Sequence, residues 1–148
     1  METFRQALLV ARVVLVDRGR VLLAHHRHED RGEDFWCFPG GHVEREEAFV
    51  EAAVRELREE TGYEVELIDV AYALDFPRGG HRGDVAELFF RARIRSGQLR
   101  VQQEPGLDGV EWVPISRLLD RPVRPAELAR AIYDGRWETW KVPLPEPS

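Results

Sequence analysis

The sequence contains a single cysteine among its 148 residues. One cysteine cannot form an intramolecular disulfide, and it excludes zinc and iron–sulfur sites that are built from several cysteines. Because Cys37 stands between Trp36 and Phe38, we interpret it as a small apolar side chain of the core. The shortage of cysteine makes a reducing compartment, the cytoplasm, the expected location.

Long hydrophobic runs are also missing. No stretch approaches the roughly 20 apolar residues that a membrane helix requires. The apolar segment 7–16 is interrupted by Arg12, and the N-terminus has neither a basic start nor a small-residue cleavage site, so we expect no signal peptide. We therefore expect no membrane partner.

Positive charge is scarce as well. The chain has 21 lysines and arginines against 27 aspartates and glutamates, which gives a formal net charge of −6 at pH 7. A protein that binds duplex nucleic acid needs a broad basic surface, so we expect no such partner. An acidic protein can still bind a phosphorylated small molecule when a divalent cation lies between the two.

The rest of the composition is that of an ordinary globular domain, with 43% hydrophobic and 32% charged residues, 12 glycines and 9 prolines. These proportions exclude a collagen-like or wholly disordered chain. We find no internal repeat and no long linker, and we predict one domain over residues 1–142. Residues 143–148 contain three prolines and are predicted to form a flexible tail.

Several segments have the pattern of β-strands. Residues 7–16 and 21–24 flank a turn at Asp17–Arg20 and are expected to form a hairpin. Residues 25–34 are polar and are predicted to form a loop, before a short buried strand at residues 35–38. Further extended segments are predicted at residues 63–74, 85–94 and 109–113.

The clearest helix is predicted over residues 47–61, where apolar residues recur at helical spacing. Gly62 follows directly, at the position where a left-handed residue commonly ends a helix. A short helix is predicted at residues 115–120 and a final helix from Pro125 to about Asp134. Strands that precede and flank helices indicate a mixed sheet covered by helices, of the α/β or α+β class.

Three glutamates of the predicted helix lie on one face. Glu56, Glu59 and Glu60 stand at positions i, i+3 and i+4, so their carboxylates repel one another on neighbouring turns. A bound cation offsets this repulsion, and oxygen ligands favour hard divalent ions such as Mg²⁺, Mn²⁺ or Ca²⁺. A solvated acidic face is the alternative for such a cluster taken alone.

The three glutamates belong to a longer pattern that is much more specific than the glutamates alone. Its positions are Gly41, Glu47, Arg55, Glu56, Leu57, Glu59, Glu60 and Gly62. With these residues, segment 41–63 resembles the Nudix box, and the segments Trp36–Gly41 and Glu111–Pro114 are similar to the usual surroundings of that box. The resemblance departs from the family pattern at Tyr63, where an aliphatic residue is more common, and at Glu46, where many members have glycine.

The resemblance to the Nudix hydrolases implies a fold and a reaction. The fold would be an α/β/α sandwich with a mixed sheet between helices. The reaction would be the hydrolysis of an acid anhydride, the diphosphate linkage of a nucleotide or a nucleoside diphosphate derivative. Nucleoside triphosphates or their 8-oxo forms, ADP-ribose, nucleotide sugars and dinucleoside polyphosphates all remain open as small-molecule substrates. The sequence leaves a monomer and a homodimer equally open.

The resemblance also implies roles for individual residues. Glu56, Glu59 and Glu60 would hold Mg²⁺ or Mn²⁺, and the backbone carbonyl of Gly40 or Gly41 would join them. Arg55 would not touch the metal. It would pair with glutamates such as Glu47 and so orient the site.

A carboxylate would accept the proton of the attacking water. Glu59 is our first candidate for this base. Glu104, in the loop before the Trp112 segment, is the second, and it is equally open as a fourth metal ligand or as an exposed loop residue.

Substrate-binding residues are less well specified by the sequence. Arg27 lies on the approach to the Trp36 segment and is a candidate for binding phosphate or ribose. Phe76 and the following loop, which contains Arg78 and Arg82, are candidates for binding the distal end of a substrate by stacking and ion pairing. Glu87, on the alternating segment that follows, completes this set.

The alternative to an enzyme is a Nudix-fold module that binds a nucleotide for regulation without cleaving it. The intact set of Arg55, Glu56, Glu59 and Glu60 favours the enzyme, because a silent domain has no need to keep it.

Overall fold

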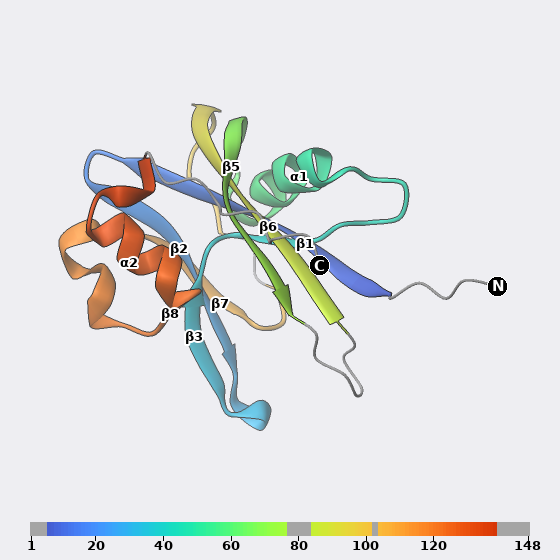
Figure 1. The fold of residues 1–148 in the computed structure, drawn as a ribbon, viewed down its shortest axis with the longest axis horizontal. Coiled ribbons are helices and arrows are strands. Elements are labelled where there is room, and N and C mark those ends of the chain that lie inside the picture. The colour runs from blue at the N-terminus through green and yellow to red at the C-terminus, as the bar shows by residue number, and fades with distance from the viewer. Residues whose placement is uncertain (1–5, 77–83, 102–103, 139–148) are drawn as a thin grey trace, which may run out of the picture.

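Strand β1 runs through the middle of a curled mixed sheet (Figure 1). The computed structural model describes residues 6–76, 84–101 and 104–138. The strands among them are β1 (Ala7–Asp17), β2 (Arg20–His28), β3 (Glu33–Cys37), β4 (Gly40–His42), β5 (Glu64–Phe76), β6 (Asp84–Ser96), β7 (Leu107–Pro114) and β8 (Val123–Arg124). The helices are α1 (Phe49–Thr61), α2 (Ala126–Tyr133) and three 3₁₀ turns at Glu29–Arg31, Ile115–Asp120 and Arg136–Glu138.

The strand order is β5-β6-β1-β2-β3-β8, with β4 paired to β1 and β7 paired to β2. Strand β1 is parallel to β6 but antiparallel to β4, and β3 is parallel to β8. The sheet is therefore mixed, as predicted. In the register of the parallel pair β1–β6, Val10 of β1 lies opposite Glu87 of β6.

Both faces of the sheet are covered by apolar packing. Residues on one face of the strands, such as Val13, Leu22 and Phe90, pack with Ala53 and Leu57 of α1. Their neighbours in the strands point to the opposite face, as the alternation of side chains in a strand requires. There Val14, Leu23 and Phe89 pack with Leu128 and Ile132 of α2. The predicted arrangement of a sheet between helices is confirmed.

Helix α1 begins two residues later than predicted. Its N-cap, Ala48, has no side chain that can cap the helix, and Glu51 instead accepts a hydrogen bond from the Ala48 N–H at 3.1 Å. The helix ends as predicted. Gly62 adopts a left-handed conformation with φ = 82°, and its N–H donates to the Arg58 carbonyl at 3.0 Å.

The prediction of a loop at residues 25–34 was wrong. Strand β2 continues to His28, and β3 already begins at Glu33, so only the 3₁₀ turn lies between them. The polarity of the segment misled the prediction, because polar side chains such as His25 and His26 are here carried by paired strands and are only partly exposed. His26 contacts Glu33 across the hairpin, with 2.9 Å between Nε2 and Oε2.

The short strands β4 and β8 and the 3₁₀ turn at Arg136–Glu138 were not predicted, whereas the remaining elements lie close to their predicted positions. The segment at residues 115–120 is a 3₁₀ helix, and Pro125 directly precedes α2. Cys37 is buried, as expected. Tyr63 packs in the α1-side core and accepts a hydrogen bond from the Trp112 indole N–H at 3.1 Å, so the aromatic departure from the box is accommodated.

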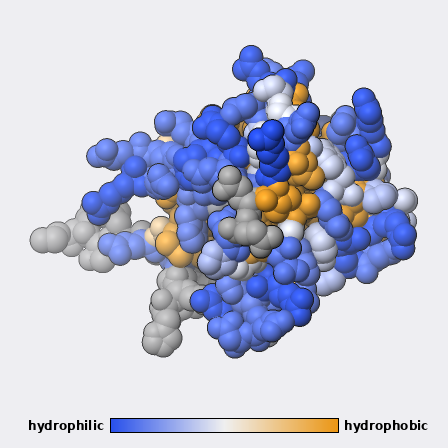
Figure 2. Space-filling model, turned by 180° about the vertical axis from the view of Figure 1, so that it is seen from behind, coloured by the Kyte–Doolittle hydropathy of each residue, from blue (hydrophilic) through white to orange (hydrophobic). Residues whose placement is uncertain are grey.

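Hydrophilic side chains cover most of the surface seen in Figure 2, with apolar side chains exposed chiefly in one central area. Within the part of the chain that the structure describes, no helix has the length and apolar character needed to span a membrane. The predicted tail at residues 143–148 lies outside the described residues.

Candidate active site

Helix α1 presents the three glutamates in three different environments. Ala52, Ala53 and Leu57 are fully buried and dock the helix on the sheet. Glu60, next to this buried face, is only 8% exposed. The side chain of Glu59 is 57% exposed, so it projects away from the sheet.

The carboxylate of Glu60 is held against the segment that precedes β4. It accepts a hydrogen bond from the Gly40 N–H at 3.1 Å. Burial raises the pKa of Glu60 to about 8, and the negative charge of Glu56 adds to this effect, although the Gly40 N–H and the Arg12 guanidinium oppose it. Glu60 therefore lies where negative charge is poorly compensated by the chain itself.

Glu56 lies directly against the backbone of β4. A Cβ atom built on Gly41 would be 2.6 Å from the carboxyl carbon of Glu56, so only glycine leaves room for this carboxylate. Burial also raises the pKa of Glu56, and the adjacent Arg55 opposes that rise. Gly41 and Glu56, two positions of the box, thus lie directly against each other.

Arg55 ties the glutamates together. Its Nε and Nη2 donate to the two carboxylate oxygens of Glu47 at 2.7 and 2.9 Å, a bidentate ion pair. Its Nη1 donates to Glu56 and to Glu59, both at 3.1 Å, and Nη2 also donates to the His42 carbonyl at 3.1 Å. The ion pair lowers the pKa of Glu47 to about 2 and raises the pKa of Arg55. The pairing of Arg55 with Glu47 expected from the sequence is present.

The site opens into a cavity of about 400 Å³. Glu56, Glu60 and Glu104 line it together with the backbone of Gly40 and Gly41. The turn that carries Glu104 is held in place, because the Leu107 N–H donates to the Glu104 carbonyl and the Arg27 N–H donates to the Gly106 carbonyl, both at 3.0 Å. Carboxylates from α1 and from the turn before β7 therefore meet in one cavity.

The donor set fits a hard divalent cation. It consists of carboxylate and carbonyl oxygens, and the raised pKa values of Glu56 and Glu60 show negative charge that a cation would stabilise. Within residues 6–76, 84–101 and 104–138, no three acidic, histidine or cysteine side chains already form a closed metal-binding cluster. Glu56 and Glu59 are instead hydrogen-bonded to Arg55.

The candidate substrate residues do not all reach this cavity. Arg27 does not line it, and its exposed side chain pairs with Glu29 at 2.7 Å. Glu87 lines a neighbouring cavity of about 420 Å³ and accepts a hydrogen bond from Arg12 at 3.1 Å. Arg78, Arg82 and the side chain of Phe76 lie outside the described residues.

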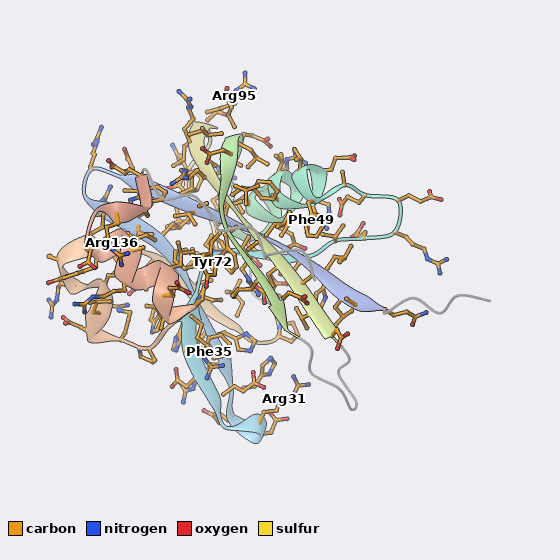
Figure 3. All side chains as sticks on the ribbon, in the orientation of Figure 1. Arg31, Phe35, Phe49, Tyr72, Arg95 and Arg136 are labelled. Carbon is orange, nitrogen blue, oxygen red and sulfur yellow. The ribbon has the colours of Figure 1, made fainter. Side chains whose placement is uncertain are left out.

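Two residues that the sequence did not single out line both cavities. These are Arg12 of β1 and Phe35 of β3, the latter labelled in Figure 3. The sequence contained one clue, because Arg12 interrupts an otherwise apolar strand.

The comparisons with known proteins agree with this geometry. A family model described as the NUDIX domain matches residues 6–133. The chain belongs to the Nudix family. Its fold is that of a solved Nudix hydrolase from Nitrosomonas europaea, with a TM-score of 0.74 and 18% identity over 94% of each chain.

Two curated relatives are similar in sequence to this Nudix domain. "Nudix hydrolase 2" of Arabidopsis thaliana is 31% identical over 108 residues, which are 70% of this chain and 37% of that protein. "RNA pyrophosphohydrolase" of Erythrobacter litoralis is 36% identical over 94 residues, 64% of this chain and 55% of that protein. The chain thus spans about half the length, or less, of these relatives.

Proposed function

We propose that this Nudix domain is a hydrolase that cleaves the diphosphate linkage of a nucleotide or of a nucleoside diphosphate derivative, with Mg²⁺ or Mn²⁺ as cofactor. The observation that carries the proposal is the meeting of Glu56, Glu60 and Glu104 in one cavity beside the Gly40–Gly41 backbone. The name of the Erythrobacter litoralis relative, a pyrophosphohydrolase, supports the same reaction class.

Glu56, Glu59 and Glu60 would hold the metal, with the carbonyl of Gly41 as a further ligand. A divalent cation in such a site neutralises phosphate charge and lowers the pKa of the attacking water. Arg55 would orient two of the ligands, because one guanidinium donates to both Glu56 and Glu59 and is itself fixed by Glu47.

We assign the proton-accepting role to Glu104 rather than to Glu59. Glu104 lines the cavity, whereas the Glu59 carboxylate is 57% exposed and hydrogen-bonded to Arg55. A base must lie within hydrogen-bond reach of the attacking water, and the position of Glu104 in the cavity satisfies this condition better. This reverses the order of preference drawn from the sequence.

The substrate would be a small phosphorylated molecule bound from the cytoplasm by a monomer or a homodimer. Glu87 remains a candidate for substrate binding through the second cavity. Arg27, Phe76, Arg78 and Arg82 remain candidates at the periphery. Nucleoside triphosphates, their 8-oxo forms, ADP-ribose, nucleotide sugars and dinucleoside polyphosphates are the classes to test.

The experiment measures products released from these five classes by chromatography, with Mg²⁺ present. A chelator and the Glu56→Gln variant serve as controls, because both remove metal binding and leave the rest of the cavity in place. Turnover that disappears in both controls supports the hydrolase and names its substrate class. Nucleotide binding without turnover of any substrate supports the regulatory module instead.

A further inference from the structure

Arg12 is a charged side chain in the middle of a buried strand. Its neighbours Val10, Ala11, Val13 and Val14 are all at most 4% exposed. The Arg12 side chain itself is 23% exposed. A guanidinium in such surroundings is costly unless its donors are satisfied, so its position requires an explanation.

Part of the explanation is structural. Nε of Arg12 donates to Glu87 at 3.1 Å, and Nη1 donates to the Phe38 carbonyl at 3.1 Å. These two partners come from β6 and from the residue after β3, and they fix the direction of the guanidinium. Within the described parts of the chain, Nη2 has no hydrogen-bond partner. Nε and Nη1 therefore hold the Arg12 guanidinium in place, and Nη2 remains available as a donor.

The Arg12 side chain lies at the junction of the two cavities. Arg12 lines the cavity of about 400 Å³ that holds Glu56, Glu60 and Glu104, and also the second cavity of about 420 Å³. Among the described residues, Arg12 is the only arginine or lysine that lines the carboxylate cavity. Of the described residues, Arg12 is therefore the permanent cation with which a phosphate bound there would pair.

The second cavity has a different character. Phe35, Leu74 and Phe89 give it apolar walls. Its charged groups are balanced in number: Arg12 and Arg124 against Glu87 and Glu127. Such a cavity suits an uncharged organic group better than a chain of phosphates.

We propose that Arg12 is a substrate-binding residue. Its Nη2 donates to a non-bridging oxygen of the phosphate that carries the organic group, and that group enters the second cavity. A guanidinium suits this role because its planar fork matches phosphate oxygens and keeps its charge at every accessible pH. The inference rests on the proposed function and deepens it, because it states how the substrate is oriented across the two cavities.

The test compares the wild type with Arg12→Gln, Arg12→Lys and the control Arg20→Gln. Arg20 lies over the Trp112 ring and lines neither of the two cavities, so its variant removes a guanidinium from a different place. Titration calorimetry with a methylene-bridged, uncleavable nucleoside diphosphate gives Kd, kinetics give kcat and KM, and Mn²⁺ titration followed by electron paramagnetic resonance gives metal affinity. Thermal unfolding reports whether each variant is folded.

A hydrogen bond to a charged group is worth about 1.5–3 kcal/mol, which is about 10- to 150-fold in Kd. We expect Arg12→Gln to weaken analogue binding and raise KM within that range, and Arg12→Lys to lose less. Mn²⁺ affinity is not expected to fall in either variant, because neither substitution adds positive charge near Glu60. Arg20→Gln is expected to match the wild type. A folded Arg12→Gln protein with wild-type Kd and KM would overturn the inference.

A second measurement does not depend on the variants. In ¹⁵N-labelled wild-type protein, the guanidinium signals of Arg12 are expected to shift when the analogue is added with a divalent metal. Analogue binding without any shift of these signals overturns the role of Arg12 and leaves the proposed function intact. A wild-type protein that neither binds nor cleaves any nucleotide overturns both.

Discussion

The carboxylate of Glu56 fills the space in front of the Gly41 Cα atom, so that a Cβ built there would be 2.6 Å from the carboxyl group. Fifteen positions separate the two residues in the sequence. Packing of α1 against β4 brings them together, and the absence of a side chain at Gly41 lets them approach.

Gly41→Ala is therefore expected to displace Glu56 and weaken metal binding by at least about tenfold, since displaced ligands lose the geometry that a metal requires. Titration of Mn²⁺ followed by electron paramagnetic resonance measures this. Gly109→Ala is the matched control, because a Cβ there would meet nothing within 4 Å. Equal Mn²⁺ affinity in the two variants would show that the contact is irrelevant to the metal.

Substitution of Arg55 by lysine tests whether the site needs the planar guanidinium or only its positive charge. Lysine keeps the charge but cannot pair bidentately with Glu47 while also reaching Glu56 and Glu59. Arg55→Lys is expected to lower kcat/KM by about 10- to 100-fold, the usual range for residues that orient metal ligands. Arg58→Lys, on the same helix but paired with the exposed Glu64, serves as control and should leave kcat/KM unchanged. A similar loss in both variants would contradict the assignment.

Glu104 and Glu59 are expected to differ in what their removal changes. Glu104→Gln should lower kcat by orders of magnitude at saturating Mg²⁺, because no carboxylate would then accept the proton. Glu59→Gln should mainly raise the Mg²⁺ concentration needed for activity. Measurements of kcat over a range of Mg²⁺ concentrations separate these effects. The opposite result, with kcat at saturating Mg²⁺ lost only in Glu59→Gln, would restore Glu59 as the base.

Glu60 makes the free energy of unfolding of the metal-free protein depend on pH. Its pKa is about 8 in the folded state against 4.5 for the ordinary carboxyl, so between these values the folded state holds a proton that the unfolded state has released. The contribution of Glu60 to the free energy of unfolding is therefore greatest below pH 4.5 and falls as the pH rises to about 8.

Denaturant unfolding in the presence of a chelator measures this dependence. Glu60→Gln cannot titrate, so its stability should fall less steeply over the same pH range and exceed that of the wild type at pH 8. Added Mg²⁺ should stabilise the wild type at pH 8 more than the variant. Parallel stability curves for the two proteins would disprove the coupling.

Glu46 adopts φ = 63°, a left-handed conformation that glycine accepts without strain. Many members of the family have glycine at this position of the box. Glu46→Gly is expected to raise the free energy of unfolding by about 0.5 kcal/mol, because relief of backbone strain is partly offset by the larger entropy of glycine in the unfolded chain. Thermal unfolding measures it. Glu46→Ala removes the charge but keeps Cβ, so an equal gain there would assign the effect to charge.

The sequence determined the parts of this protein that depend on local spacing. The apolar stripe and Gly62 defined helix α1 to within two residues at its start, and the spacing of Gly41, Arg55 and the three glutamates identified the box. The hairpin and the strands β3, β5, β6 and β7 followed from alternation and turn residues, whereas the short strands β4 and β8 were not predicted. The polar segment 25–34 was misjudged, because polarity alone does not distinguish a loop from a paired hairpin with polar side chains.

Only the tertiary structure decided which distant residues share the site. The parallel pairing of β1 with β6 brings Arg12 to Glu87, 75 positions away, and no local pattern encodes that register. The turn before β7 carries Glu104 into the same cavity as Glu56 and Glu60, because its backbone is fixed to the end of β2. Local spacing therefore specifies the helix and its carboxylates, whereas long-range strand pairing decides what those carboxylates face.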